Sequence, residues 1–120
     1  MLYYIEMTFG DRLRDLRKER GLTQKELASK VRIDFTYLSK IENDRMPPPS
    51  EKTIVELARE LGAHEDELLL LAKKVPRSMR NLIVERKDVP VILRRIIEDD
   101  LTEEELTQFI EDRKKREEKP

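Results

Sequence analysis

The strongest structural constraint in this chain is a pair of short amphipathic segments joined by a tight corner, in residues 22–43. The first segment has one apolar face at helical spacing, formed by Leu27, Ala28 and Val31. Because Ala28 is small, a second helix can cross close above it. The pattern therefore predicts two helices packed across each other, with a corner short enough to fix their crossing.

Local hydrogen-bonding residues indicate where both helices begin. Thr23 and Glu26 form a Thr-x-x-Glu capping box at the start of the first helix. Asp34 is placed to cap the second helix. Ile33 lies in the corner between them, and we expect it to point into the core.

The second helix has an apolar side and a polar side. Leu38 and Ile41 face inward together, with Phe35 and Tyr37 on the two flanks. At about 100° per residue, the opposite direction falls on four polar residues: Thr36, Ser39, Lys40 and Asn43. This polar stripe is expected to face solvent.

One carboxylate lies at the edge of the expected core. Glu42 follows Ile41 directly, and a half-buried carboxylate needs a partner. Arg17, on the preceding helix, is the candidate for that ion pair.

The segment resembles the helix-turn-helix of the phage Cro and repressor (XRE) family of DNA-binding regulators, and a looser resemblance extends from Phe9 to about Leu71. The residues that carry it are Arg17, Gly21, Gln24, Leu27, Ala28, Val31, Leu38, Ile41, Glu42 and Asn43. The resemblance implies an all-α fold, in which a five-helix repressor-like domain is followed by a C-terminal helical extension. It also implies that the second helix enters the major groove of duplex DNA.

The resemblance and the outward stripe together suggest roles for individual side chains. Base contacts are expected from Phe35, Thr36, Ser39 and Lys40. Phosphate contacts are expected from Thr23, Gln24, Tyr37, Asn43 and Arg45. In the same comparison, Arg17 and Glu42 occupy the positions of a buried structural ion pair.

Three residues depart from the family pattern. Arg32 stands at the corner position usually held by Gly, so the corner is either strained or differently shaped. Asp44 replaces a second frequent Gly, and Asp tolerates left-handed geometry better than most residues. Phe35 stands where a polar residue is common, so its ring either contacts a thymine methyl or packs against its neighbours.

Cap and stop residues predict three further helices in the expected DNA-binding domain, residues 8–74. The first is capped by Thr8 and ended by Gly21, the fourth is capped by Ser50 and ended by Gly62, and the fifth spans about 65–73. Their expected core residues are Phe9, Leu13, Leu16, Ile54, Leu57, Ala58 and Leu61. Residues 1–7 form an apolar leader, which we expect to be a disordered or loosely packed end, with an arm that touches a partner as the alternative.

Residues 75–120 are expected to form a C-terminal segment of three amphipathic helices. The first is expected to bury Val75, Met79, Leu82 and Ile83. The second opens at Asp88 and the third at Thr102, where Glu105 completes a capping box. The tail after Glu111 has no apolar residue and is expected to fray.

Apolar residues of this segment, together with the four consecutive leucines 68–71, need a covering surface. The segment is too short for a self-sufficient core, so it must pack on the first domain or on another chain. We expect dimerisation, with capping of its own domain as the alternative. The residues expected at the interface are Leu69, Leu70, Val89, Ile92, Leu93, Ile96, Ile97, Leu106, Phe109 and Ile110.

The composition excludes several other classes of protein. With 25 basic and 26 acidic residues, the net charge of −1 argues against indiscriminate nucleic-acid binding but allows a specific binder with one basic face. The chain has no Cys and only one His, His64, so no metal, cofactor or enzyme activity is expected. No apolar run is long enough to span a membrane, and we expect a cytoplasmic protein.

These observations predict a sequence-specific transcriptional regulator, a repressor that binds a palindromic operator in double-stranded DNA as a homodimer. One recognition helix contacts only a few base pairs, and two helices about 34 Å apart contact two half-sites. The alternative is an antitoxin-like or adaptor protein, whose C-terminal helices bind a partner protein.

Overall fold

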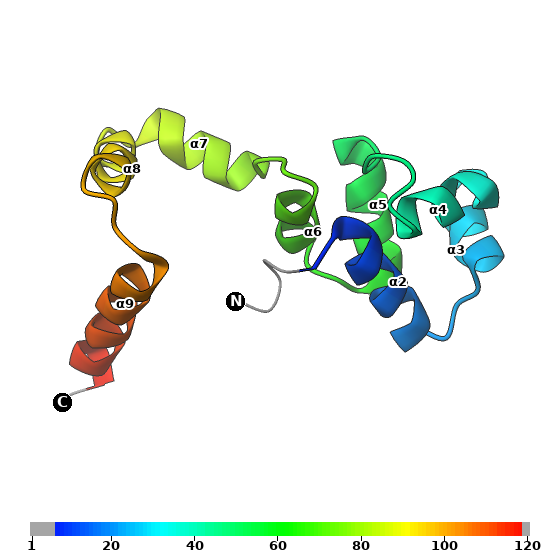
Figure 1. The fold of residues 1–120 in the computed structure, drawn as a ribbon, viewed down its shortest axis with the longest axis horizontal. Helices are drawn as coiled ribbons and strands as arrows, with labels where there is room; N and C mark the ends of the chain where they lie inside the picture. Colours follow the sequence, from blue (N-terminus) through cyan, green and yellow to red (C-terminus); the bar gives the residue numbers. More distant parts are fainter. Residues whose placement is uncertain (1–6, 119–120) are drawn as a thin grey trace. The chain divides into compact units, whose positions relative to one another are not determined.

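The computed structural model describes residues 7–118, and every regular element in this range is a helix (Figure 1). The all-α fold class expected from the sequence is confirmed. The chain divides into two compact units, the first ending at Arg77 and the second beginning at Ser78. Apart from Met7, the apolar leader lies outside the described residues.

Between residues 7 and 74 the first unit contains five helices with the expected starts. They are α2 (Phe9–Glu19), α3 (Gln24–Val31), α4 (Phe35–Glu42), α5 (Glu51–Leu61) and α6 (Glu65–Leu71). The side chains of Thr8, Thr23, Asp34 and Ser50 each accept a hydrogen bond from a backbone N–H in the first turn of α2, α3, α4 and α5 respectively. Gly21 and Gly62 follow α2 and α5 with φ of 67° and 61°, where L side chains are strained.

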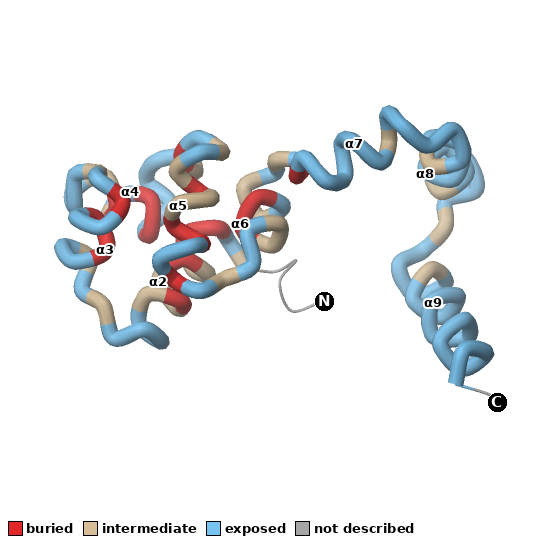
Figure 2. The backbone as a smooth tube through the Cα atoms, turned by 180° about the vertical axis from the view of Figure 1, so that it is seen from behind, coloured by how far each residue is buried: buried red, intermediate tan, exposed pale blue. Residues whose placement is uncertain are grey.

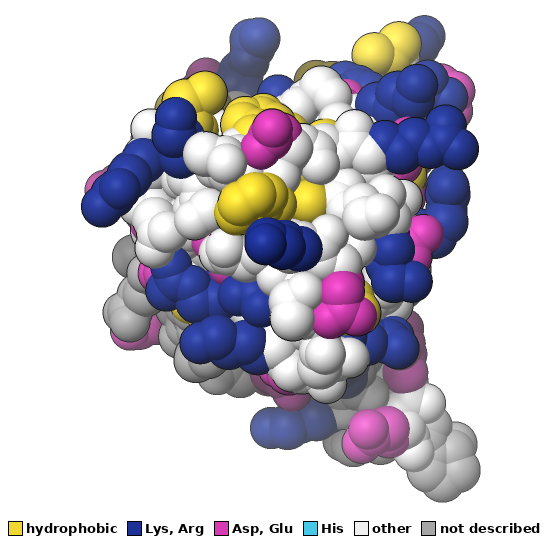
Figure 3. Space-filling view, turned by 90° about the vertical axis from the view of Figure 1, so that its right-hand side faces the viewer, with side chains coloured by type: hydrophobic (Ala, Val, Ile, Leu, Met, Phe, Trp, Pro, Cys, Tyr) yellow, Lys and Arg dark blue, Asp and Glu magenta, His cyan; other side chains and the backbone are white. Residues whose placement is uncertain are grey.

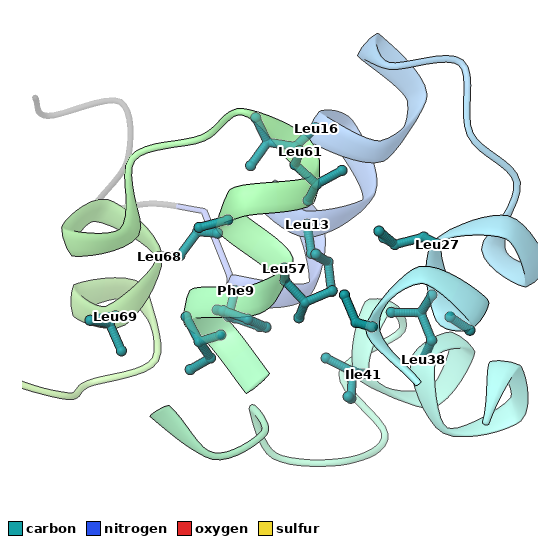
Figure 4. Close-up of a cluster of buried hydrophobic side chains, with 14 residues drawn as sticks. Phe9, Leu13, Leu16, Leu27, Leu38, Ile41, Leu57, Leu61, Leu68 and Leu69 are labelled. Carbon is teal, nitrogen blue, oxygen red and sulfur yellow. The ribbon is translucent and has the colours of Figure 1, made fainter. Parts of the chain in front are cut away.

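The core of the first unit lies around α5, which packs against α3 and α6 (Figure 4). Helix α2 packs against α4 and α6, and α3 packs against α4. Every core residue expected from helices α2 to α5 is buried: Phe9, Leu13, Leu16, Leu27, Ala28, Val31, Leu38, Ile41, Ile54, Leu57, Ala58 and Leu61. The scaffold therefore holds the α3–α4 pair on one side of the unit.

Helix α6 separates its four leucines between core and solvent. Leu68 and Leu69 are buried, whereas Leu70 is 48% exposed. The expectation that Leu69 belongs to an interaction surface is therefore wrong, because its side chain is already packed in the core of its own unit. The helix ends at Leu71, earlier than expected, and Lys73 beyond it has a left-handed backbone with φ of 60°.

The C-terminal helices are α7 (Arg77–Glu85), α8 (Asp88–Glu98) and α9 (Glu103–Glu118). None of the residues from 77 to 118 is buried (Figure 2). The prediction that the first of these helices buries Val75, Met79, Leu82 and Ile83 is wrong for a single chain, because α7, α8 and α9 do not enclose a common core.

The expectation that the charged tail frays is also wrong as far as residue 118. Helix α9 continues to Glu118 through side chains spaced one turn apart. Arg113 Nε lies 3.2 Å from Glu117 Oε1, and Gln108 donates a hydrogen bond of 2.9 Å to Asp112. Such pairs at i and i+4 stabilise exposed helices without any apolar contact.

None of the helices in residues 7–118 combines the length and the hydrophobicity needed to cross a membrane. In the same part of the chain, no cluster of three His, Cys, Asp or Glu side chains is arranged to hold a metal ion.

Candidate nucleic-acid interface

Helix α4 is fixed by its apolar side and presents its polar side to solvent. Leu38 and Ile41 are 0% and 1% exposed, and both belong to the core of the first unit. The Asp34 carboxylate accepts a hydrogen bond of 2.7 Å from the backbone N–H of Thr36, which fixes the start of the helix. Thr36 and Lys40 lie on the exposed side.

The corner between α3 and α4 is tight and strained. Arg32 has φ of 59° and ψ of 44°, which is left-handed geometry, so the strained alternative is the one that the structure adopts. The backbone N–H of Ile33 donates to the carbonyl of Ala28 at 3.0 Å and closes the turn. Ile33 packs against the core as expected. Asp44 also has positive φ, of 57°.

Arg17 and Glu42 form a buried ion pair between α2 and α4. Arg17 Nε lies 2.7 Å from Glu42 Oε2, Arg17 Nη2 lies 2.9 Å from Oε1, and the Glu42 side chain is 0% exposed. Arg17 Nη1 also donates to the carbonyl of Leu22, at 2.8 Å. The Arg17 guanidinium thus joins α2 both to the end of α4, through Glu42, and to Leu22, which precedes α3.

Gln24, a residue expected to contact phosphate, belongs to the same hydrogen-bond network. Its Nε2 donates to Glu42 Oε1 at 3.1 Å, and its side chain is half-buried. The Nε2 atom carries two N–H groups, and one of them is engaged with Glu42. Glu42 therefore helps to orient Gln24.

Arg14 is a part of the site that the sequence analysis missed. Its Nη2 donates to the carbonyl of Glu42 at 2.9 Å and to Asn43 Oδ1 at 2.7 Å. Asn43 Nδ2 donates to the carbonyl of Ser39 at 2.9 Å. Arg14 lies one turn before Arg17 on α2, and this spacing was the only signal in the sequence that could have placed it beside the end of α4.

Phe35 is positioned by a lysine of the neighbouring helix. Lys25 Nζ lies over the Phe35 ring, 5.1 Å from the ring centroid, and the Phe35 side chain remains 45% exposed. A cation at this distance is attracted to the face of an aromatic ring. Lys25 was not among the expected site residues, because no pattern in the sequence relates it to Phe35.

The exposed surface of α3, α4 and the loop after them is basic. Figure 3 looks onto this end of the first unit, where Lys and Arg side chains gather around the margin and acidic side chains are fewer. The exposed basic residues are Lys25, Lys30, Arg32, Lys40 and Arg45. The exposed acidic residues of the same surface are Glu26, Asp34 and Asp44, so five basic minus three acidic residues leave a net charge of +2. The hydrogen bond from the Thr23 backbone N–H holds the pKa of Glu26 below its ordinary value.

The expected DNA-contacting residues all lie on α3, α4 and their adjoining turns. Phe35, Thr36, Lys40, Thr23, Asn43 and Arg45 are exposed, whereas Ser39, Tyr37 and Gln24 are half-buried. The expected interaction residues of the C-terminal segment lie on α8 and α9. The two sets of residues thus belong to different units.

An exposed helix held by a capped helix-turn-helix on a five-helix core defines a DNA-binding domain. Residues 10–74, just over half of the chain, match the model of a helix-turn-helix domain. The chain belongs to this helix-turn-helix family of DNA-binding transcriptional regulators, of the phage-repressor (XRE) type.

Several relatives share this domain. The chain is 46% identical over 56 residues to the immunity repressor protein of Bacillus phage phi105, covering 47% of this chain and 38% of the phage protein. It is 41% identical over 63 residues to the transcriptional regulator DdrOP3 of Deinococcus deserti, covering 52% and 48% of the two chains. The similarity thus spans less than half of each of these two relatives.

A shorter relative and a solved structure are covered more fully. The chain is 35% identical over 71 residues to the helix-turn-helix regulator y4dJ of Sinorhizobium fredii, covering 59% of this chain and 91% of that one. Its fold is similar to a solved complex of the SinR and SinI proteins, with a TM-score of 0.51 and 22% identity over 93% of this chain and 100% of that chain. At this identity, the likeness to the SinR/SinI structure concerns the fold alone.

Proposed function

We propose that this chain is a cytoplasmic, sequence-specific repressor that binds a palindromic operator in duplex DNA as a homodimer. The observation that carries the proposal is the exposed edge of α4, where Thr36 and Lys40 face solvent while Leu38 and Ile41 anchor the opposite side. A helix held in this way can enter the major groove and donate or accept hydrogen bonds at base edges.

Phosphate contacts would position α4 in the groove. Thr23, Gln24 and Asn43 lie at the start of α3 and the end of α4, and Arg45 is exposed in the loop that follows. Hydrogen bonds to phosphate fix the orientation of a protein on DNA without selecting a sequence. The chain as a whole carries a net charge of −1, so selectivity would depend on the base contacts of α4.

Two further features support a repressor that acts as a dimer. The C-terminal helices expose apolar residues that a second copy could cover, among them Ile92 and Phe109, which are 54% and 66% exposed. One of the relatives is named an immunity repressor. A dimer bound across two half-sites would occlude a promoter sterically.

The test is a selection of bound sequences from a random duplex pool, followed by gel-shift titration on the selected operator. We expect two inverted half-sites about one helical turn apart. The double variant Thr36→Ala with Lys40→Ala should lose specific binding and keep its fold. Arg59→Ala, an exposed basic residue at the end of α5, is the control that should bind normally. Normal binding by the double variant would refute the assignment of α4.

The second candidate is an adaptor or antitoxin-like protein. It is favoured by the absence of any buried residue between residues 77 and 118, since exposed apolar helices are suited to a protein partner. The protein of similar fold was solved as a complex of SinR with SinI. The Thr36→Ala with Lys40→Ala variant separates the two functions, because it should keep any partner bound through the C-terminal helices.

A further inference from the structure

Helix α9 has a narrow apolar face that its own chain leaves largely uncovered. Phe109 and Ile110 are 66% and 50% exposed, and Leu106 is half-buried. At about 100° per residue these three side chains share one side of the helix. No other part of α9 carries apolar residues, so this face is where a partner would bind.

Charges of opposite sign flank this face at its two ends. Glu103 and Lys114 lie along one edge, and Glu105 and Arg116 lie along the other. On each edge the acidic residue is in the first turn of α9 and the basic residue is near its end. The helix therefore presents an acidic half and a basic half on the same side as its apolar residues.

We propose that α9 pairs antiparallel with α9 of a second copy of this chain, with Phe109 of each copy opposite Ile110 of the other. This inference rests on the homodimer of the proposed function and gives that dimer a direction and a register. In this register Leu106 lies opposite Arg113 of the second copy, whose aliphatic stem can cover it while the guanidinium stays in water.

The charges select the antiparallel direction. The proposed register places Glu103 beside Lys114 of the second copy, and Glu105 beside Arg116. Because the two copies are equivalent, each of these contacts occurs twice. A parallel pair would instead bring like charges together, with Glu103 across from Glu105 of the second copy and Lys114 across from Arg116. Charges that flank an apolar seam determine the orientation of paired helices in this way.

The hydrogen bonds and ion pairs that these side chains make within one chain are weak enough to exchange. Lys114 Nζ lies 3.8 Å from Glu111 Oε1, and both side chains are more than half exposed. Glu105 accepts a hydrogen bond of 3.2 Å from the Thr102 hydroxyl, which is also exposed. Exposed ion pairs of this kind contribute little to the stability of the chain, so contacts across a dimer can replace them.

Helix α9 would not hold a dimer alone, because its apolar face has only three residues. Helix α8 belongs to the same unit and exposes Val91, Ile92 and Ile97, at 62%, 54% and 79%. The apolar residues of α8 would thus add the area that a stable association needs, and α9 would fix the direction of pairing.

The test uses the absence of cysteine from the chain. Full-length Glu103→Cys and Lys114→Cys chains are prepared separately, mixed in equal amounts and oxidised. We expect a disulfide-linked dimer in the mixture and none from either variant alone. A mixture of Glu104→Cys with Lys115→Cys chains is the matched control, because these residues lie on the opposite side of α9 and should not be linked.

A charge exchange checks the same register without a covalent bond. The variant Glu103→Lys with Glu105→Lys should weaken self-association, measured by sedimentation, by at least about tenfold. Mixing it with a Lys114→Glu and Arg116→Glu chain should restore a mixed dimer.

The outcomes separate this inference from the proposed function. A wild-type chain that remains monomeric on sedimentation would overturn the homodimer itself. A wild-type dimer that gives no link between residues 103 and 114 would refute the α9 pairing and leave the homodimer standing. A link in a mixture of Glu103→Cys with Glu105→Cys chains, prepared in the same way, would instead show a parallel pair.

Discussion

A Cβ atom placed on Gly10 would lie 2.4 Å from the carbonyl oxygen of Ile41, and 2.8 Å from that of Glu42. Gly10 is in the first turn of α2, and both carbonyls belong to the end of α4. Any side chain at residue 10 would therefore push the two helices apart. Because glycine has no side chain, the end of α4 can pack this closely against α2.

Replacing this glycine tests the close approach. Gly10→Ala should lower the free energy of unfolding by about 1–3 kcal/mol, the usual cost of overpacking. At an open helical position the same change would be stabilising by about 0.5–1 kcal/mol. Urea unfolding of the purified chain measures the difference, with exposed Lys18→Ala on the same helix as control. A Gly10→Ala chain as stable as the wild type would show that α4 can shift without cost.

The buried ion pair gives a second prediction. Glu42→Ala removes the carboxylate that accepts from Arg17 and Gln24 and leaves a guanidinium without its partner. We expect a loss of about 3–5 kcal/mol in unfolding free energy. Thermal unfolding with a midpoint close to that of the wild type would show that the pair contributes little.

A double variant separates the ion pair from the packing around it. Arg17→Met combined with Glu42→Met removes both buried charges, and the cation that loses its carboxylate partner is then Arg14, which lies 3.8 Å from Glu42 Oε1 and is 32% exposed. The double variant should lose clearly less unfolding free energy than the two single variants lose together, because each single variant leaves one buried charge without its partner. Additive losses would mean that the two side chains act independently.

The strained corner at Arg32 predicts a variant that is more stable than the wild type. Arg32→Gly relieves a left-handed backbone that costs a non-Gly residue about 1 kcal/mol, so it should raise the unfolding free energy by up to that amount. Lys30→Gly, at a helical position of α3, is the control and should cost about 1 kcal/mol. A destabilised Arg32→Gly chain would show that the arginine side chain makes a contact worth more than the strain.

The core and the caps of the first unit could be predicted because they depend on residues a few positions apart. The spacing of Leu27, Ala28 and Val31 marks a buried face, and Thr23 with Glu26 marks a helix start without reference to the rest of the chain. The structure contains both features.

Among features that join distant parts of the chain, the Arg17–Glu42 ion pair could be predicted, because a half-buried carboxylate needs a partner and the family resemblance supplies Arg17. Other long-range features could not. The contact of Arg14 with Asn43 spans 29 positions, and its only signal in the sequence is that Arg14 lies one turn before Arg17. Which of four consecutive leucines faces the core depends on how α6 docks, and this is why Leu69 was misplaced. The lack of apolar residues in the tail predicts fraying, whereas charge pairs one turn apart keep it helical as far as residue 118.

The capping box of α3 makes stability depend on pH. The hydrogen bond from the Thr23 backbone lowers the pKa of Glu26 from 4.5, so Glu26 stabilises the fold above its unfolded pKa. That stabilisation is lost as the pH falls through the folded pKa. Glu26→Gln keeps the hydrogen-bond acceptor and loses the charge. Its thermal midpoint should lie below the wild-type value at neutral pH and approach it in acid, whereas exposed Glu60→Gln should show no such convergence.

The last prediction tests whether the Phe35 ring recognises a thymine through its methyl group. The ring, held under Lys25, is an exposed apolar group at the start of α4, and the thymine methyl is the apolar group that DNA presents in the major groove. Each thymine of the selected operator is replaced in turn by deoxyuridine, which lacks only that methyl. At one position per half-site, wild-type affinity should fall about fourfold, corresponding to about 0.8 kcal/mol for one buried carbon.

The matched variant decides between the two interpretations of the ring. Phe35→Ala should bind the thymine and deoxyuridine operators equally well at that position, because the group that contacts the methyl is gone. Lys25→Ala should reduce the discrimination only in part, since the ring remains but is held less firmly. If Phe35→Ala and the wild type respond alike to deoxyuridine at every position, the ring packs only against its neighbours, and sequence selectivity depends on the polar residues of α4.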